Sequence, residues 1–69
     1  MNRMKIRITK YVLVEVQKNK IDEIWDKSLQ RWDELNVEKM DVQGKVANLT
    51  AANDDVYLSV PVDSFEVLS

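Results

Sequence analysis

The chain has 69 residues, with 10 Lys and Arg against 12 Asp and Glu, one Gly, one Pro and neither Cys nor His. This length predicts one small domain, and the missing Cys and His exclude disulfides, Cys/His zinc sites, thiol nucleophiles and histidine acid–base catalysis. Ile, Leu, Val and Phe make up 21 residues, enough for a packed core. No apolar run has the length of a membrane span, and no signal peptide is predicted.

Charge is unevenly distributed along the chain. Residues 1–20 sum to +5 and residues 21–69 to −7. Such asymmetry indicates either a segment that faces nucleic acid or two segments that neutralise each other within one fold. The second interpretation is favoured, because strands from the two ends of a small chain commonly pair and opposite charges across a pair are mildly stabilising.

The first predicted element is a β-strand over residues 4–16, where apolar and polar side chains alternate and β-branched residues are common. Lys10 is the one exception to the alternation. A straight strand of this length would span about 43 Å, which is long for so small a domain. We therefore expect a bend or bulge near Thr9–Lys10, which also re-aims the lysine.

The second predicted element is an amphipathic helix over residues 20–35. Its apolar side chains recur at helical spacing, with Asn19 as the N-cap and Asn36 as a left-handed residue at the C-terminal end. The apolar stripe consists of Ile21, Ile24, Trp25, Leu29, Trp32 and Leu35, with Ser28 inside it. This pattern predicts that both tryptophans are buried against a sheet.

The remaining residues favour β-structure. Residues 40–50 predict a less regular strand with a bulge at Gly44, and residues 51–55 a polar turn. Residues 56–62 alternate again and predict another strand, whose Pro61 end lies on a sheet edge or leaves the sheet. Residues 64–68 fit either a short strand or a single helical turn.

The predicted order is therefore β-α-β-β with an optional fourth strand, an α+β domain over residues 1–69. One helix packs on one face of a three- or four-stranded mixed or antiparallel sheet. A right-handed crossover makes the first two strands parallel if they share a sheet. The strand over 56–62 is expected to lie antiparallel between them.

The acidic residues do not predict catalysis or metal binding. Asp22 and Asp26 lie one turn apart on the solvated face of the predicted helix, where nothing would desolvate them for acid–base work. Residues 53–55 offer oxygen ligands for Ca²⁺ or Mg²⁺, but they lack EF-hand spacing, and ordinary turn chemistry is favoured. We predict no enzyme activity, no cofactor and no metal.

Three basic side chains lie at alternate positions of the first predicted strand: Arg3, Lys5 and Arg7. Tyr11 and Leu13 continue the same side of the strand, and Tyr57 is expected to join them. These residues predict an aromatic and apolar patch with a charged rim, a composition typical of protein-binding surfaces.

Two other interpretations of the charged residues are open. The basic row could hold phosphates while a base stacks on Tyr11, although a sequence pI of about 5.0 is the reverse of what nucleic-acid-binding domains show. An acid-rich stretch could instead mimic nucleic acid, although a solvated helix face is favoured. That stretch contains Asp22, Glu23, Asp26, Asp33, Glu34, Glu38 and Asp41.

In its size, its predicted element order and its lack of catalytic residues, the chain resembles small Cys-free accessory proteins that bacteriophages and mobile elements encode to bind and inhibit or redirect a host protein. The resemblance implies a cytoplasmic bacterial setting and a protein target, such as a nuclease or another defence component. We therefore hypothesise a non-catalytic interaction module that acts by steric or electrostatic occlusion. The alternative is a small nucleic-acid-binding regulator that uses the basic strand. A second copy of the chain is a further candidate partner.

Overall fold

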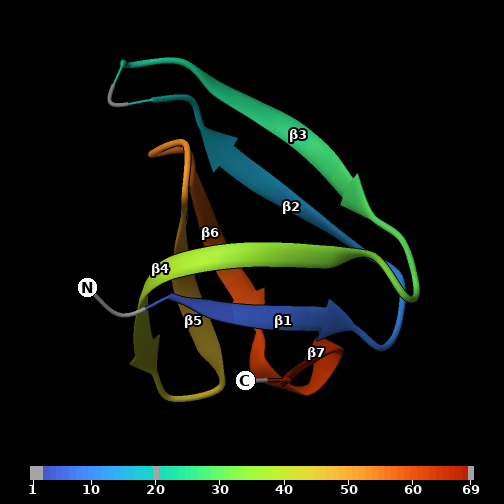
Figure 1. Ribbon diagram of the computed structural model, residues 1–69. Helices are drawn as coiled ribbons and strands as arrows, with labels where there is room; N and C mark the ends of the chain where they lie inside the picture. The colour runs from blue at the N-terminus through green and yellow to red at the C-terminus, as the bar shows by residue number, and fades with distance from the viewer. Residues whose placement is uncertain (1–2, 20, 69) are drawn as a thin grey trace.

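The computed structural model of the protein describes residues 3–19 and 21–68. Within these ranges seven strands form one antiparallel sheet in the order β3-β2-β6-β5-β4-β1-β7. The single sheet curls around its own core (Figure 1), in a molecule that measures 29 × 28 × 23 Å. The strands are β1 (Met4–Ile8), β2 (Val12–Gln17), β3 (Ile24–Leu29), β4 (Glu34–Gln43), β5 (Val46–Ala51), β6 (Val56–Pro61) and β7 (Phe65–Val67).

The core lies on the concave side of the sheet, where alternate residues of the strands point inward. Ile6, Ile8, Leu49 and Val60 are fully buried. Burying a side chain of this size contributes roughly 1.5–3 kcal/mol. The other buried apolar side chains are Val14, Val16, Leu29, Val37, Ala47, Ala51 and Tyr57.

The bend predicted near Thr9–Lys10 is confirmed, and it divides the predicted strand over 4–16 into β1 and β2. The Thr9 N–H donates to the Ser64 carbonyl at 2.8 Å, which anchors the bend. Lys10, the exception to the alternation, points away from the core and forms an ion pair with Asp63 at 3.1 Å.

The helix predicted over residues 20–35 is wrong. Residue 20 lies outside the described residues, and residues 24–29 form β3, which pairs antiparallel with β2 from Val12↔Leu29 to Gln17↔Ile24. The tertiary fold overrides the helical spacing, because β2 gains a complete antiparallel partner from the adjacent hairpin. Both tryptophans are correspondingly 57% exposed rather than buried.

The expected helix caps also have other roles. Asn19 has φ 42° in the turn between β2 and β3, so it is a turn residue and not an N-cap. Asn36 lies within β4, opposite Lys5 of β1. Asparagine tolerates the left-handed region better than most residues, which suits it to this turn as well as to a helix end.

The bulge predicted at Gly44 is a hairpin turn between β4 and β5. Gly44 has φ +64° and no atom within 4 Å of an added Cβ, so the turn requires glycine for its backbone angle and not for space. The true irregularities lie elsewhere, at Val37/Lys39 in β4 and between Tyr57 and Val60 in β6, opposite Ala47/Leu49 of β5. At the second of these, the Asn48 side chain accepts a hydrogen bond from the Ser59 N–H at 2.9 Å.

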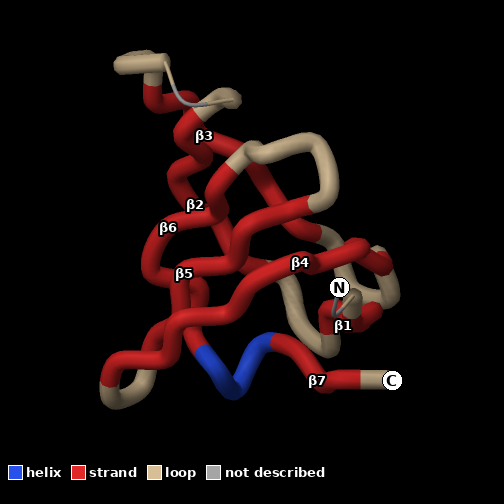
Figure 2. Tube along the Cα trace, turned by 60° about the vertical axis from the view of Figure 1, so that its left-hand side comes forward, coloured by secondary structure: helices blue, strands red, loops and turns tan. Residues whose placement is uncertain are grey.

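Of the two alternatives for residues 64–68, the structure shows the short strand, β7. A 3₁₀ turn, η1 (Val62–Ser64), is followed directly by β7, which pairs with β1 (Figure 2). As predicted, β6 lies antiparallel between β2 and β5.

The predicted α+β class, with its packed helix and its parallel crossover, is wrong, because every strand pair is antiparallel and η1 is the only helical segment in the described ranges. The described part of the chain also contains no helix with the length and apolar character of a membrane span.

Candidate functional site

The basic row lies on the outer face of β1, where acidic side chains neutralise it. Arg7 is 3.4 Å from Glu34 of β4 and 3.9 Å from Glu66 of β7, so strands from the two ends of the chain pair with opposite charges, as expected. The remaining ion pairs are Arg3–Glu38 at 3.7 Å and Lys5–Glu34 at 3.8 Å. The row is thus part of a mixed-charge surface and not a free cationic strip.

The structure does not bring Tyr57 to the same surface as the other predicted binding residues. Tyr57 lies on the inner side of β6 and is only 8% exposed, whereas Tyr11 and Leu13 are 58% and 60% exposed. The predicted patch therefore loses Tyr57. The reason is a bulge in β6, where Ser59 has φ 52° and the register against β5 shifts, so that Tyr57 and Val60 both face the core.

Trp32 joins Tyr11 and Leu13 at one end of the β2–β3 hairpin. The segments that carry these residues meet where β1 leads into β2 and β3 leads into β4 (Figure 1). The backbone N–H of Trp32 donates to the Ile8 carbonyl at 2.7 Å, and this hydrogen bond joins the turn between β3 and β4 to the end of β1. Tyr11, Leu13 and Trp32 are called the aromatic end below.

Sequence reasoning missed Trp32 as a surface residue because it completed a helical stripe. The signal that could have identified it is its position directly before Asp33, a residue type common in turns. The Asp33 N–H donates to the Gln30 carbonyl at 3.0 Å, and the Asp33 carboxylate accepts from the Gln30 N–H at 2.9 Å. The Arg31 guanidinium lies 4.6 Å from the Trp32 ring centre, a cation–π distance.

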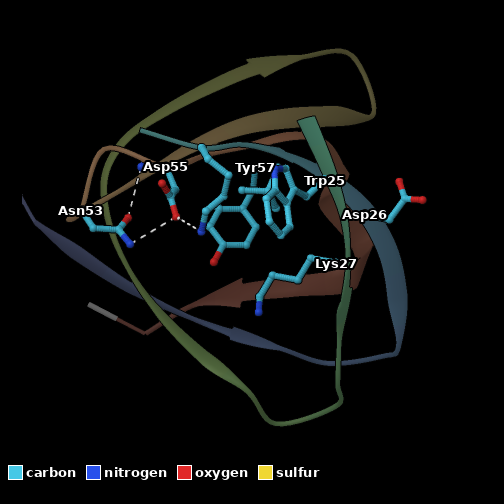
Figure 3. A pocket seen from close by; sticks show the side chains of 8 residues that line it. Trp25, Asp26, Lys27, Asn53, Asp55 and Tyr57 are labelled. Atoms are coloured by element: carbon cyan, nitrogen blue, oxygen red, sulfur yellow. Dashed lines mark hydrogen bonds and ion pairs between the residues drawn. The ribbon is translucent and has the colours of Figure 1, made fainter. Parts of the chain in front are cut away.

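A cleft of about 320 Å³ opens at the other end of the hairpin, between β3 and the turn that leads into β6. Trp25 and Tyr57 present their rings to it, and the Asp26 side chain points away (Figure 3). Trp25 is on the core-facing side of β3, opposite Val16 of β2, but β3 is an edge strand and leaves it 57% exposed. The full lining is Val16, Lys18, Trp25, Asp26, Lys27, Asn53, Asp55 and Tyr57.

Asp55 forms the polar end of this cleft and is only 5% exposed. Its carboxylate accepts hydrogen bonds from Lys18 Nζ at 2.8 Å, from the Asn19 N–H at 2.8 Å and from Asn53 Nδ2 at 3.3 Å. The Asp55 N–H donates in turn to the Asn53 side chain at 3.1 Å. Residues 53–55 therefore do not serve as metal ligands here: Asp55 joins the turn before β6 to the turn after β2 (Figure 3).

These contacts change the ionisation of three groups in the cleft. The hydrogen bond from Lys18 lowers the pKa of Asp55, although burial of the carboxyl opposes it. The same hydrogen bond raises the pKa of Lys18. Burial, with the charge of Asp55, raises the pKa of Tyr57. At neutral pH the cleft therefore contains an ion pair beside a neutral phenol.

The chemistry of the cleft is suited to binding. The Asp55 carboxylate is held ionised and has its lone pairs engaged by three donors, so it is a structural acceptor rather than an available base. Within the described ranges no group of three or more acidic side chains could hold a metal ion.

Comparisons with protein-family models, curated proteins and solved structures found no match to this chain.

Proposed function

We propose that the protein is a non-catalytic interaction module that binds a partner protein through the aromatic end. The observation that carries the proposal is the conformation and exposure of Trp32. It has φ 77° and is 57% exposed, although a bulky residue in the left-handed region is strained. Residues in such conformations cluster at functional sites, where the surrounding structure maintains the strain.

Tryptophan is an unfavourable residue for its position in this turn if only the stability of the fold is considered. The hydrogen bond from the Asp33 N–H to the Gln30 carbonyl places Trp32 at the third position of a β-turn. With φ positive there, glycine or asparagine is the normal residue. Because an exposed ring adds little to the core, we infer that the ring is present for a contact with another molecule.

The wider surface supports a protein as the partner. Within the described residues nine large apolar side chains are exposed, and six of them lie between residues 11 and 32. Tryptophan, tyrosine and arginine dominate the binding energy of protein interfaces, and Arg31 is stacked on Trp32. The surface therefore has aromatic anchors with a polar surround.

We further propose that binding inhibits or modulates the partner by steric occlusion, since the proposed contact covers a surface and requires no chemistry. The resemblance to phage and mobile-element accessory proteins now rests on size and the lack of catalytic residues, since the predicted element order is wrong. It suggests a cytoplasmic bacterial protein as the target, such as a nuclease or another defence component. The neutralised basic row supports a protein partner over nucleic acid, because Glu34, Glu38 and Glu66 already occupy its cations.

Affinity capture from a bacterial lysate, followed by mass spectrometry, tests the proposal. The test variant is Tyr11→Ser/Leu13→Ser/Trp32→Gly, and the matched control is Val42→Ser/Val67→Ser, which removes side chains that are 53% and 54% exposed outside the hairpin. We expect the wild type and the control to retain the same partner and the test variant to lose it. The purified partner should then lose activity when the wild-type protein is added.

Capture that is unchanged by the test variant would exclude the aromatic end. Loss of capture in the control as well would indicate a general effect on folding, which circular dichroism of both variants identifies. Retention of DNA or RNA in a salt-sensitive manner would favour the alternative of a nucleic-acid-binding regulator.

A further inference from the structure

The free edge of β3 is a second surface, separate from the aromatic end. β3 is the terminal strand of the sheet and pairs only with β2 among the described strands. All its residues except Leu29 are exposed. Unpaired edge strands are normally protected by a bulge, a proline, charged side chains or a covering loop, because they readily pair with another strand. β3 pairs with β2 without a register shift and contains no proline, and its charged side chains are Asp26 and Lys27.

The ladder with β2 defines which backbone groups point outward. The Lys18 N–H donates to the Glu23 carbonyl at 3.1 Å, so Glu23 directs its carbonyl toward β2. Direction alternates along an antiparallel strand, so Trp25 and Lys27 also direct their groups inward to β2. Ile24, Asp26 and Ser28 consequently present their N–H and C=O groups at the free edge.

We propose that the occupant of this edge is β3 of a second copy, paired antiparallel about a two-fold axis at Trp25. A two-fold axis through such a pair keeps each face of the sheet on one side, so residues of the same face lie opposite each other. With Trp25 opposite Trp25 of the second copy, Ile24 lies opposite Asp26 of that copy. Each of these outward-facing pairs exchanges both N–H···O=C bonds.

Charge complementarity selects this register. It places Glu23 opposite Lys27 of the second copy on both sides of the axis, and opposite charges across a strand pair are stabilising. The next two registers place Asp26 opposite Asp26, or Lys27 opposite Lys27, and like charges directly opposite are destabilising. In the described structure Lys27 forms no ion pair, so its charge is available for this contact.

The pairing also extends the cleft. Trp25 of the second copy lies at a position where cross-strand side chains approach closely, on the same face as the cleft lined by Trp25 and Tyr57. Aromatic pairs across a strand are among the stabilising ones. A single strand edge buries much less area than a stable dimer interface, so we expect association in the micromolar to millimolar range.

Charge-reversal variants, with association measured by sedimentation velocity, test both the dimer and its register. The variants are Lys27→Glu, Glu23→Lys and the double variant Glu23→Lys/Lys27→Glu, with Lys45→Glu in the β4–β5 turn as the matched control. Each single variant turns two attractive pairs into two repulsive pairs, and we expect roughly tenfold weaker association. The double variant should associate like the wild type, and the control should have no effect.

Amide hydrogen exchange provides a measurement that needs no variant. As the concentration rises, we expect the Ile24 and Asp26 amides to become protected, while the Trp25 and Lys27 amides are protected at every concentration because they bond to β2. A protein that stays monomeric, an association that ignores both single variants, or a double variant that is not restored would each overturn the proposal. Because the aromatic end is not involved, none of these results decides the proposed partner binding.

Discussion

Lys18 Nζ lies 2.8 Å from Asp55 Oδ2, and this ion pair joins the turn after β2 to the turn before β6. The Asn19 N–H strengthens the same junction by donating to the other oxygen of Asp55 at 2.8 Å. The junction places the tip of the β2–β3 hairpin against the β5–β6 turn and so defines one wall of the cleft. It also makes the stability of the fold depend on pH.

The first prediction concerns acid. Asp55 has a pKa below its ordinary value of 3.8 in the folded state, so its contribution to stability is complete above pH 3.8 and is lost as the pH falls through the folded pKa. Asp55→Asn should therefore lower the melting temperature at pH 7 and flatten its decline in acid. The control is Asp54→Asn, the neighbouring carboxyl. Thermal denaturation followed by circular dichroism measures both, and equal acid profiles for Asp55→Asn and the wild type would contradict the prediction.

The alkaline side follows from Lys18. Its folded pKa lies above its ordinary value of 10.5, so its contribution is complete below pH 10.5 and is lost as the pH rises through the folded pKa. Tyr57, with a pKa raised above 10.0, adds a loss in the same direction. Lys18→Met should therefore lower the melting temperature at pH 7 and flatten its decline in base, with Lys39→Met as the control, and equal alkaline profiles for Lys18→Met and the wild type would contradict this.

The core prediction concerns Leu49, which is fully buried on β5. Leu49→Ala should lower the free energy of unfolding by about 2–5 kcal/mol, since it removes buried methyl groups and leaves a cavity. For a domain of this size the loss approaches the whole stability. Val42→Ala, at a side chain that is 53% exposed, should change the free energy by less than about 0.5 kcal/mol. Urea denaturation compares the two, and similar values would place the core elsewhere.

The turn prediction separates folding from binding at Trp32. Trp32→Gly relieves a strained left-handed conformation at φ 77°, at the cost of a more flexible unfolded chain. We expect the free energy of unfolding to stay the same or to rise by up to about 1 kcal/mol, while partner capture is lost. Urea denaturation and the capture experiment provide the two measurements. A loss of several kcal/mol would show instead that the indole supports the fold.

The charge prediction concerns the outer face of β1. Because Glu34 forms ion pairs with both Lys5 and Arg7, the wild type should show no salt-sensitive retention of DNA or RNA in a gel shift. Glu34→Gln frees Lys5 and leaves Arg7 with Glu66 alone, and it should produce weak retention at low salt that disappears at about 0.2 M salt. Clear retention by the wild type at both salt concentrations would contradict this interpretation.

Several local features could be predicted from the sequence because they depend on neighbouring residues. The period-two alternation identified the residues of β1, β2 and β6, and the excess length of the first strand predicted the bend at Thr9–Lys10. The polar turn over residues 51–55 and the neutralisation of Arg7 by a C-terminal acid also followed from the sequence. Tyr11 and Leu13 were correctly placed on the surface.

The exposure of Trp25 and Trp32 was decided by the tertiary structure. Their spacing fits a helix and also fits a strand, a turn and a second strand, and local preference does not separate these alternatives. β2 needs a hydrogen-bonding partner on each side, and the segment after it supplies one at low entropic cost. Burial depends on which strands meet across the chain, so only the folded sheet determines that Tyr57 faces the core and that β3 has a free edge.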